Sequence, residues 1–243
     1  MELSGRVALV TGAARRVGRA LALRLADAGC HVAVHYRSSR VEAATTVEEC
    51  HSRGVEAEAF QADFGDLTAV AGLIGPVLSR FGRLDILVNN ASVFEPMSIA
   101  EFDLQAWERT LRINLTAPMV LTDAAREALG RDGGRVINLL DAGIARAGPD
   151  RIAYIVSKGA LETLTRVLAR ALAPQVNVVG IAPGIAAWSG DYDQESRDRL
   201  TGKVPLKRAG TPEDVAAAVY FVLSEGDYVT GAILPIDGGR SLV

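Results

Sequence analysis

The sequence predicts an α/β protein with one doubly wound parallel sheet of about seven strands, flanked by helices. Short apolar runs that end in Gly, Asn or Asp alternate along the chain with longer segments of helical period. A turn of mostly small residues, Thr11 to Gly18, separates the first apolar run from the first helical segment. Because the chain contains no linker, internal repeat or low-complexity tract, residues 1–243 are expected to form a single domain.

Seven apolar runs are the candidate strands. They are Arg6–Thr11, His31–Tyr36, Ala57–Asp63, Asp85–Asn89, Arg135–Leu140, Asn177–Ile181 and Ala232–Ile236. After the first run, Val17, Leu21 and Leu25 recur at helical spacing, which predicts a helix that begins near Arg16 and ends at Gly29.

One stretch near the C-terminus is more polar than the rest of the chain. Trp188 to Lys203 is rich in Asp, Ser and Arg, and it is predicted to form an exposed loop or short helices beside the site. We expect this substrate loop to span about residues 186–204.

The charge balance limits the classes of partner. The chain has 26 basic and 29 acidic residues, a formal net charge of -3, which argues against a general nucleic-acid or anionic-membrane binder. No apolar run approaches the roughly 18–20 residues of a membrane-spanning helix, and the first residues lack the layout of a signal peptide. A cytoplasmic location is therefore expected.

The cysteines and histidines do not form a recognisable metal or disulfide motif. Cys30 and Cys50 have no paired spacing, and His35 and His51 do not supply ligand spacing beside them. Two buried, inert thiols and no metal site are expected.

The turn after the first predicted strand has the composition of a phosphate-binding turn. It reads Thr11-Gly12-Ala13-Ala14-Arg15-Arg16-Val17-Gly18, and small residues there let backbone N–H groups approach a pyrophosphate. The motif is weak alone, because Arg16 stands where many nucleotide turns have a third glycine. Its context strengthens it, since Asp63, Asn90 and Asp141 also lie at strand ends, where ligands bind in a Rossmann-type sheet.

The end of the second predicted strand favours NADP over NAD. NAD enzymes usually place a carboxylate there for the ribose 2′-hydroxyl, but no carboxylate occurs between Asp27 and Glu42. The segment His35-Tyr36-Arg37-Ser38-Ser39 instead offers a guanidinium and hydroxyl donors, which suit a 2′-phosphate. The alternative is that Arg37 and Arg40 are merely solvated loop charges.

Tyr154 and Lys158 are candidate catalytic residues. They stand at i and i+4 of a segment that continues with helical spacing, so they share one helix face. A nearby ammonium favours the phenolate, and we therefore expect Lys158 to bring the pKa of Tyr154 closer to neutral and to hold the nicotinamide ribose. The Tyr-x-x-x-Lys pattern alone usually marks an ordinary helix face.

Together these motifs resemble the short-chain dehydrogenase/reductase family. The further features are Asn89-Asn90-Ala91 after the fourth strand, Asn114 in the following helix and Pro183-Gly184 after the sixth strand. The resemblance extends from Val7 to Gly239. It implies that Asn114 supports a proton relay, and that the protein is a homotetramer.

One departure from the family pattern points to a branch within it. Asp141, 13 residues before Tyr154, stands where the family usually has a serine that bonds the tyrosine and the substrate. An aspartate there resembles the pteridine reductases, as do Arg16, Ser92 and Phe94. The tail resembles them too, in Lys203-Val-Pro-Leu-Lys-Arg, Tyr228-Val-Thr-Gly and Asp237-Gly-Gly-Arg-Ser-Leu. Singly, each of these residues could have an ordinary structural role, such as core packing or capping.

The resemblance and the motifs assign three sets of residues. The catalytic set is Asp141, Tyr154, Lys158 and Asn114. The set for NADPH is Gly12, Arg16, Val17, Gly18, His35, Tyr36, Arg37, Ser38, Asp63, Phe64, Asn90, Ala91, Tyr154, Lys158, Pro183, Gly184 and Ile185. The substrate set is Arg16, Ser92, Phe94, Asp141, Tyr154 and Trp188, where Trp188 could line the pocket or lie on its rim.

The hypothesis favoured by these residues is an NADPH-dependent pteridine reductase. Hydride would pass to a C=N bond of a dihydropterin, such as dihydrobiopterin, dihydromonapterin or dihydrofolate, with Tyr154 as proton donor. One alternative is an NADPH-dependent carbonyl reductase of the same family, in which Phe94 only packs. A second is a non-catalytic NADPH-binding sensor, suggested by the replaced serine.

Overall fold

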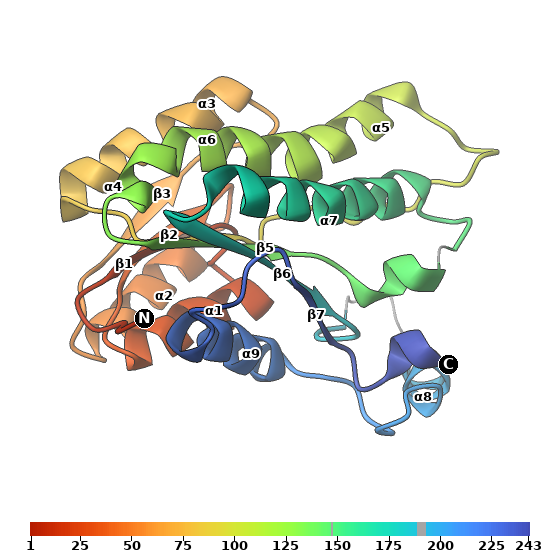
Figure 1. Ribbon diagram of the computed structural model, residues 1–243. Coiled ribbons are helices and arrows are strands. Elements are labelled where there is room, and N and C mark those ends of the chain that lie inside the picture. Colours follow the sequence, from red (N-terminus) through yellow and green to blue (C-terminus); the bar gives the residue numbers. More distant parts are fainter. Residues whose placement is uncertain (147, 189–192) are drawn as a thin grey trace.

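The computed structural model describes residues 1–146, 148–188 and 193–243, and it contains the predicted sheet. Seven parallel strands lie in the order β3-β2-β1-β4-β5-β6-β7 (Figure 1). Their bounds are β1 Val7–Val10, β2 His31–Tyr36, β3 Ala57–Gln61, β4 Ile86–Asn89, β5 Gly134–Leu139, β6 Val176–Pro183 and β7 Ile233–Ile236. The α/β fold class is therefore confirmed.

Helices cover both faces of the sheet (Figure 1). One face carries α1 (Arg16–Asp27), α2 (Arg40–His51) and α9 (Pro212–Glu225). The other carries α3 (Leu67–Gly72), α4 (Ile74–Phe81), α6 (Ala117–Gly130) and α7 (Ile152–Leu172). The remaining elements are α5 (Leu104–Leu111), the π-helical turn η1 (Arg112–Thr116), the 3-10 turn η2 (Ala142–Arg146), α8 (Gln194–Gly202) and the 3-10 turn η3 (Arg240–Leu242).

The central strands are buried along their whole length. Every residue of β1, β4 and β5 is buried, because helices pack on both faces of a parallel sheet. The two cysteines belong to the apolar layer on the α1 side, and burial raises the pKa of Cys30 to about 12 and that of Cys50 to about 11. Both thiols are thus held in the protonated, unreactive form, as expected.

Several strands end earlier than predicted. Thr11, Asp63 and Leu140 lie just beyond the ends of β1, β3 and β5, at the edge where the chain turns toward the next element. Conversely, β6 runs on to Pro183, two residues past its predicted end. The first helix begins at Arg16 as predicted, and it ends at Asp27, just before the left-handed Gly29 (φ +82°).

The polar segment near the C-terminus is partly helical. Its first residue, Trp188, is described, residues 189–192 lie outside the described residues, and α8 follows from Gln194. Asp193 begins α8 as its N-cap, accepting a hydrogen bond from the N–H of Ser196 at 2.8 Å. No helix in the described part of the chain is both long and apolar enough to cross a membrane.

His35, the fifth residue of β2, is buried beneath the turn that follows β1. Its Nδ1 accepts a hydrogen bond from the N–H of Gly12 (3.0 Å), and its Nε2 lies 3.1 Å from the carbonyl oxygen of Ala62, so Nε2 carries the proton. The ring also stacks on Phe64, with centroids 4.3 Å apart. Burial lowers the pKa of His35 to about 4, so the imidazole is neutral at pH 7.

This buried imidazole predicts an acid-sensitive fold. The pKa of His35 falls from 6.5 in the unfolded chain to about 4 in the folded one, so the unfolded chain binds a proton first. The neutral imidazole therefore contributes to the free energy of unfolding fully above pH 6.5. About 3 kcal/mol of this contribution is lost as the pH falls toward 4. We expect urea unfolding of the His35→Gln variant to show a pH dependence weaker by that amount. Parallel curves for the variant and the parent would contradict this prediction.

Candidate functional site

A cleft of about 1010 Å³ opens at the carboxyl ends of the central strands. Twenty of the predicted site residues line it: Gly12, Arg16, Val17, Gly18, His35, Tyr36, Arg37, Ser38, Asp63, Phe64, Asn90, Ala91, Ser92, Phe94, Asp141, Tyr154, Lys158, Pro183, Gly184 and Ile185. Trp188 lines it as well, whereas Asn114 lies behind the wall. The predicted residues therefore meet in one place, although they come from the ends of six strands and from helix α7.

The turn after β1 is held to the end of β4 by hydrogen bonds. Thr11 Oγ1 accepts from the N–H groups of Asn90 (2.8 Å) and Ala91 (2.9 Å), and Asn90 Nδ2 donates to the carbonyl of Thr11 at 2.7 Å. Gly12 has φ +64°, and a Cβ on Gly18 would lie 2.1 Å from the carbonyl oxygen of Gly12. The two glycines are thus required by the backbone, which brings α1 close to the turn.

The N-terminus of α1 faces the cleft without a cap from the protein. Arg15, its N-cap residue, makes no side-chain cap hydrogen bond, and the first turn has no acidic residue. Free N–H groups at a helix N-terminus bind anions well, because the helix dipole adds a partial positive charge. This end of the cleft can therefore hold a pyrophosphate.

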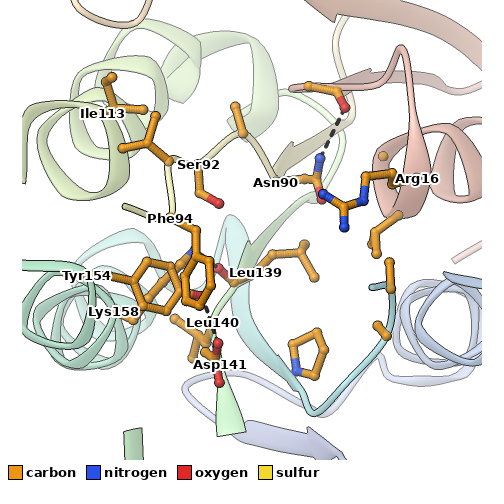
Figure 2. Close-up of a pocket in the computed structure, with 18 of the residues that line it drawn as sticks. Arg16, Asn90, Ser92, Phe94, Ile113, Leu139, Leu140, Asp141, Tyr154 and Lys158 are labelled. Carbon is orange, nitrogen blue, oxygen red and sulfur yellow. Dashed lines mark hydrogen bonds between the residues drawn. The ribbon is translucent and has the colours of Figure 1, made fainter. Parts of the chain in front are cut away.

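Arg16 has a backbone conformation that side chains disfavour. Its φ of 54° lies in the left-handed region, which explains why many related turns have glycine here. Its guanidinium donates to the carbonyl oxygen of Trp188 at 2.7 Å, across the mouth of the cleft. Figure 2 shows Arg16 beside Asn90, on the side of the cleft opposite Phe94 and Tyr154. A strained residue with its side chain at a cleft indicates a functional side chain.

The end of β2 supplies a second anion-binding feature. Arg37 and Ser38 are exposed where they line the cleft, and Arg37 has no ion-pair partner in the part of the chain that the structure describes. The cap of α2, Ser39, makes no side-chain cap hydrogen bond. This chemistry fits a phosphate on a ribose and contains no carboxylate that would repel one.

Tyr154 is bonded to Asp141 on the opposite side of the cleft. Its hydroxyl donates to Asp141 Oδ2 at 2.7 Å, while Asp141 Oδ1 accepts from the N–H of Gly143 at 2.6 Å. Burial, and then the charge and hydrogen bond of Asp141, raise the pKa of Tyr154 well above its usual value. The expected downward shift of this pKa is therefore wrong, because the carboxylate and burial outweigh the cations nearby. A phenol held protonated in this way can donate a proton.

Lys158 is buried one helical turn from Tyr154. Its Nζ donates to the carbonyl oxygen of Leu139 at 2.6 Å and lies 5.9 Å from the centroid of the Tyr154 ring. Burial lowers its pKa to about 8, although Asp141 acts in the opposite direction. The ammonium thus retains its charge at neutral pH and remains the buried cation of the site.

Asn114 supports the cleft wall from behind. It lies in the π-helical turn η1, and it exchanges two hydrogen bonds with the backbone of Val93, at 2.9 and 3.0 Å. Its Nδ2 also donates to Ser157 Oγ at 3.1 Å. These contacts position the segment that carries Ser92 and Phe94, and the part of Asn114 in a proton relay stays a prediction.

Phe94 projects over the tyrosine. Its ring meets that of Tyr154 edge to face, with centroids 4.6 Å apart, and it remains 47% exposed (Figure 2). The guanidinium of Arg151 lies 4.3 Å from the Phe94 centroid, and backbone hydrogen bonds tie Met97 to Asp150 and Ile152. The loop after β4 is therefore fixed to the start of α7, and this fixes Phe94 at the cleft.

Besides Arg37 and the arginines of the turn after β1, four further arginines line the cleft, and none of them belongs to the predicted site set. They are Arg146, Arg151, Arg199 and Arg240, from η2, the start of α7, α8 and η3. Arg199 lies in the expected substrate loop and Arg240 in the tail that resembles the pteridine reductases, whereas Arg146 and Arg151 belong to no motif of the sequence. Arg151 also affects Tyr154, because its positive charge lowers the pKa of the phenol and so opposes the effect of Asp141. No group of three potential metal ligands occurs among the described residues.

Comparison with known proteins assigns the family. A family model described as enoyl-(acyl carrier protein) reductase matches residues 12–241, nearly the whole chain. The chain belongs to the short-chain dehydrogenase/reductase family. The relatives that it matches are named as oxidoreductases, and the chain is accordingly an oxidoreductase of this family, in agreement with the sequence motifs.

Individual relatives of this short-chain oxidoreductase carry different names. The structure of FolM alternative dihydrofolate reductase 1 from Brucella canis, complexed with NADP, superposes with a TM-score of 0.94 at 33% identity, covering 100% of this chain and 96% of that one. A blue fluorescent protein from a metagenomic library, in complex with NADPH, has a TM-score of 0.92 at 35% identity, with 99% of each chain covered. The 3-oxoacyl-(acyl-carrier-protein) reductase FabG of Staphylococcus aureus is 34% identical over 96% of both chains.

The strained Arg16 of this oxidoreductase yields a test of its role. Replacing Arg16 by glycine relieves the left-handed backbone, so we expect the free energy of unfolding to stay unchanged or to rise by up to about 1 kcal/mol. The dissociation constant of NADPH should rise about tenfold, because a charged hydrogen-bond donor is lost from the cleft. Arg15→Gly is the control for stability alone: the φ of Arg15 is -148°, so glycine there relieves no strain. A clear loss of stability in Arg16→Gly with unchanged binding would show that Arg16 is structural.

Proposed function

We propose that this short-chain reductase transfers hydride from NADPH to a C=N bond of a dihydropterin, with Tyr154 as proton donor. The observation that carries the proposal is the hydrogen bond between Tyr154 and Asp141, at the position where the family usually has a serine. The similarity to a Brucella dihydrofolate reductase supports it, because dihydrofolate contains the same ring. Phe94 and Arg16 add an aromatic face and a donor at the same cleft.

The hydrogen-bond donors and the glycine turn of the cleft suit NADPH. The uncapped N-terminus of α1 and the Gly12 turn suit the pyrophosphate, and Arg37 and Ser38 suit the 2′-phosphate. Lys158 supplies the buried cation next to the tyrosine, which suits the ribose of the nicotinamide. When bound, NADPH supplies the hydride that reduces the C=N carbon.

The protein residues then have separate parts in the reaction. Phe94 stacks on the flat pterin ring, and Arg16 donates to an acceptor on it. Tyr154 stays protonated because of burial and Asp141, so it can donate a proton to the ring nitrogen as the carbon receives hydride. Asp141 orients the Tyr154 hydroxyl and, through water, accepts hydrogen bonds from the ring. Lys158 stabilises the negative charge left on the phenol oxygen.

A second candidate is a carbonyl reductase. It is favoured by the similarity to the Staphylococcus FabG protein, named as a 3-oxoacyl-(acyl-carrier-protein) reductase. In that case Phe94 only closes the wall of the cleft, and the oxygen of a ketone takes the proton from Tyr154.

Substrate turnover separates the two candidates. We expect the purified protein to oxidise NADPH with dihydrobiopterin, dihydromonapterin or dihydrofolate, and to do so poorly with NADH, because Arg37 has no partner without a 2′-phosphate. The measurement is the loss of absorbance of NADPH with each pterin and with a panel of ketones and 3-oxoacyl thioesters. Turnover of ketones or thioesters alone would overturn the proposal, and binding of NADPH with no turnover would indicate a sensor.

A further inference from the structure

The cleft is strongly cationic although the chain as a whole is acidic. Among the described residues, seven arginines and one lysine line it against three aspartates, whereas the whole chain has a net charge of -3. The positive residues are Arg15, Arg16, Arg37, Arg146, Arg151, Arg199, Arg240 and Lys158, and the negative ones are Asp63, Asp141 and Asp150. A concave surface of one sign concentrates ligands of the opposite sign.

The cofactor accounts for only part of this charge. Arg15, Arg16 and Arg37 lie at the ends of β1 and β2, where the phosphates of NADPH are expected. Arg151 is engaged with the Phe94 ring, and its buried Nε has no hydrogen-bond partner. Three arginines remain, and they come from three other segments of the chain.

These three residues, Arg146, Arg199 and Arg240, are here called the rim arginines. They belong to η2, α8 and η3, and η2 packs against η3. The segment after α8 is tied to the residues before η3, because the N–H of Leu206 donates to the carbonyl oxygen of Gly238 at 3.2 Å. Figure 1 shows α8 and the C-terminus at the same end of the molecule. Three segments distant in sequence thus each bring one arginine to the cleft.

The rim arginines have no ion pair within residues 1–146, 148–188 and 193–243. By contrast, many arginines elsewhere are paired, such as Arg83 with Asp85 and Arg208 with Asp214. Asp193, the acid before α8, is used as the cap of that helix. Unpaired guanidinium groups at a cleft suit a carboxylate or phosphate, which can accept two parallel hydrogen bonds from each.

We propose that the rim arginines bind an anionic group on the side chain of the substrate. The enzyme then prefers dihydropterins with a charged side chain over those with a neutral one. This inference rests on the proposed function and narrows it, because a carboxylate-bearing or phosphate-bearing side chain distinguishes substrates that share one ring.

Three substrates with the same ring test the preference. Dihydrofolate carries carboxylates, dihydroneopterin phosphate carries a phosphate, and dihydrobiopterin has a neutral side chain. At low salt we expect kcat/KM for at least one anionic substrate to exceed that for dihydrobiopterin by about tenfold, and the better one identifies the anion. The advantage should shrink in about 0.5 M NaCl, because salt screens exposed charges.

Variants link the preference to the rim. In the double variant Arg199→Gln/Arg240→Gln we expect the KM ratio of the anionic to the neutral substrate to rise about fivefold to tenfold, with KM for NADPH little changed. Arg170→Gln is the control, because Arg170 is exposed at the end of α7 outside the cleft. Thermal unfolding monitored by circular dichroism checks that the variants fold.

The outcomes separate this inference from the proposed function. If dihydropterins are reduced with equal efficiency whatever their charge, or if the variant raises KM for NADPH instead, the inference is wrong and the proposed function stands. If none of the three is reduced, the proposed function fails and the inference with it.

Discussion

The hydrogen bonds between Thr11 and Asn90 are the interaction on which the site depends. They join the ends of β1 and β4, neighbouring strands whose following loops diverge to opposite faces of the sheet. One loop continues into α1 and its anion-binding N-terminus, and the other continues to Ser92 and Phe94. Because one threonine and one asparagine side chain fix both loops, the phosphate end and the ring end of the cleft are held in a constant relation.

On the Tyr154 side of the cleft, burial determines the pKa values of the two catalytic side chains. Tyr154 and Lys158 are both buried, and burial moves their pKa values in opposite directions, upward for the phenol and downward for the ammonium. The two pKa values, which are similar in free side chains, therefore move apart, and Asp141, which touches the phenol, acts to raise both. A serine at that position would bond the same hydroxyl without a charge. Asp141 thus adds an electrostatic bias toward the protonated tyrosine.

The sequence was sufficient for the sheet, the glycine turn and most of the site. Strand ends carry Thr11, Asn90 and Asp141, and residues at the carboxyl ends of parallel strands must meet at one edge. The direction of the Tyr154 pKa was missed, because helical spacing gives the distance to Lys158 but not the degree of burial. Arg199 and Arg240 fall in segments that the sequence singled out, the substrate loop and the tail, but no spacing links them with each other or with Arg146, and only the fold brings the three segments together. The burial of His35 beneath the turn likewise depends on the pairing of β1 with β2.

The most direct test of the account is the ratio of two activities in one variant, Asp141→Ser. If the carboxylate makes the site selective for a C=N bond, the serine should lower kcat/KM for a dihydropterin by about a hundredfold and leave or raise the low activity toward ketones. The ratio of the two efficiencies, measured under one set of conditions with NADPH, is then lower by about two orders of magnitude. An unchanged ratio, whether both activities survive or both fall together, would show that Asp141 does not determine which bond is reduced.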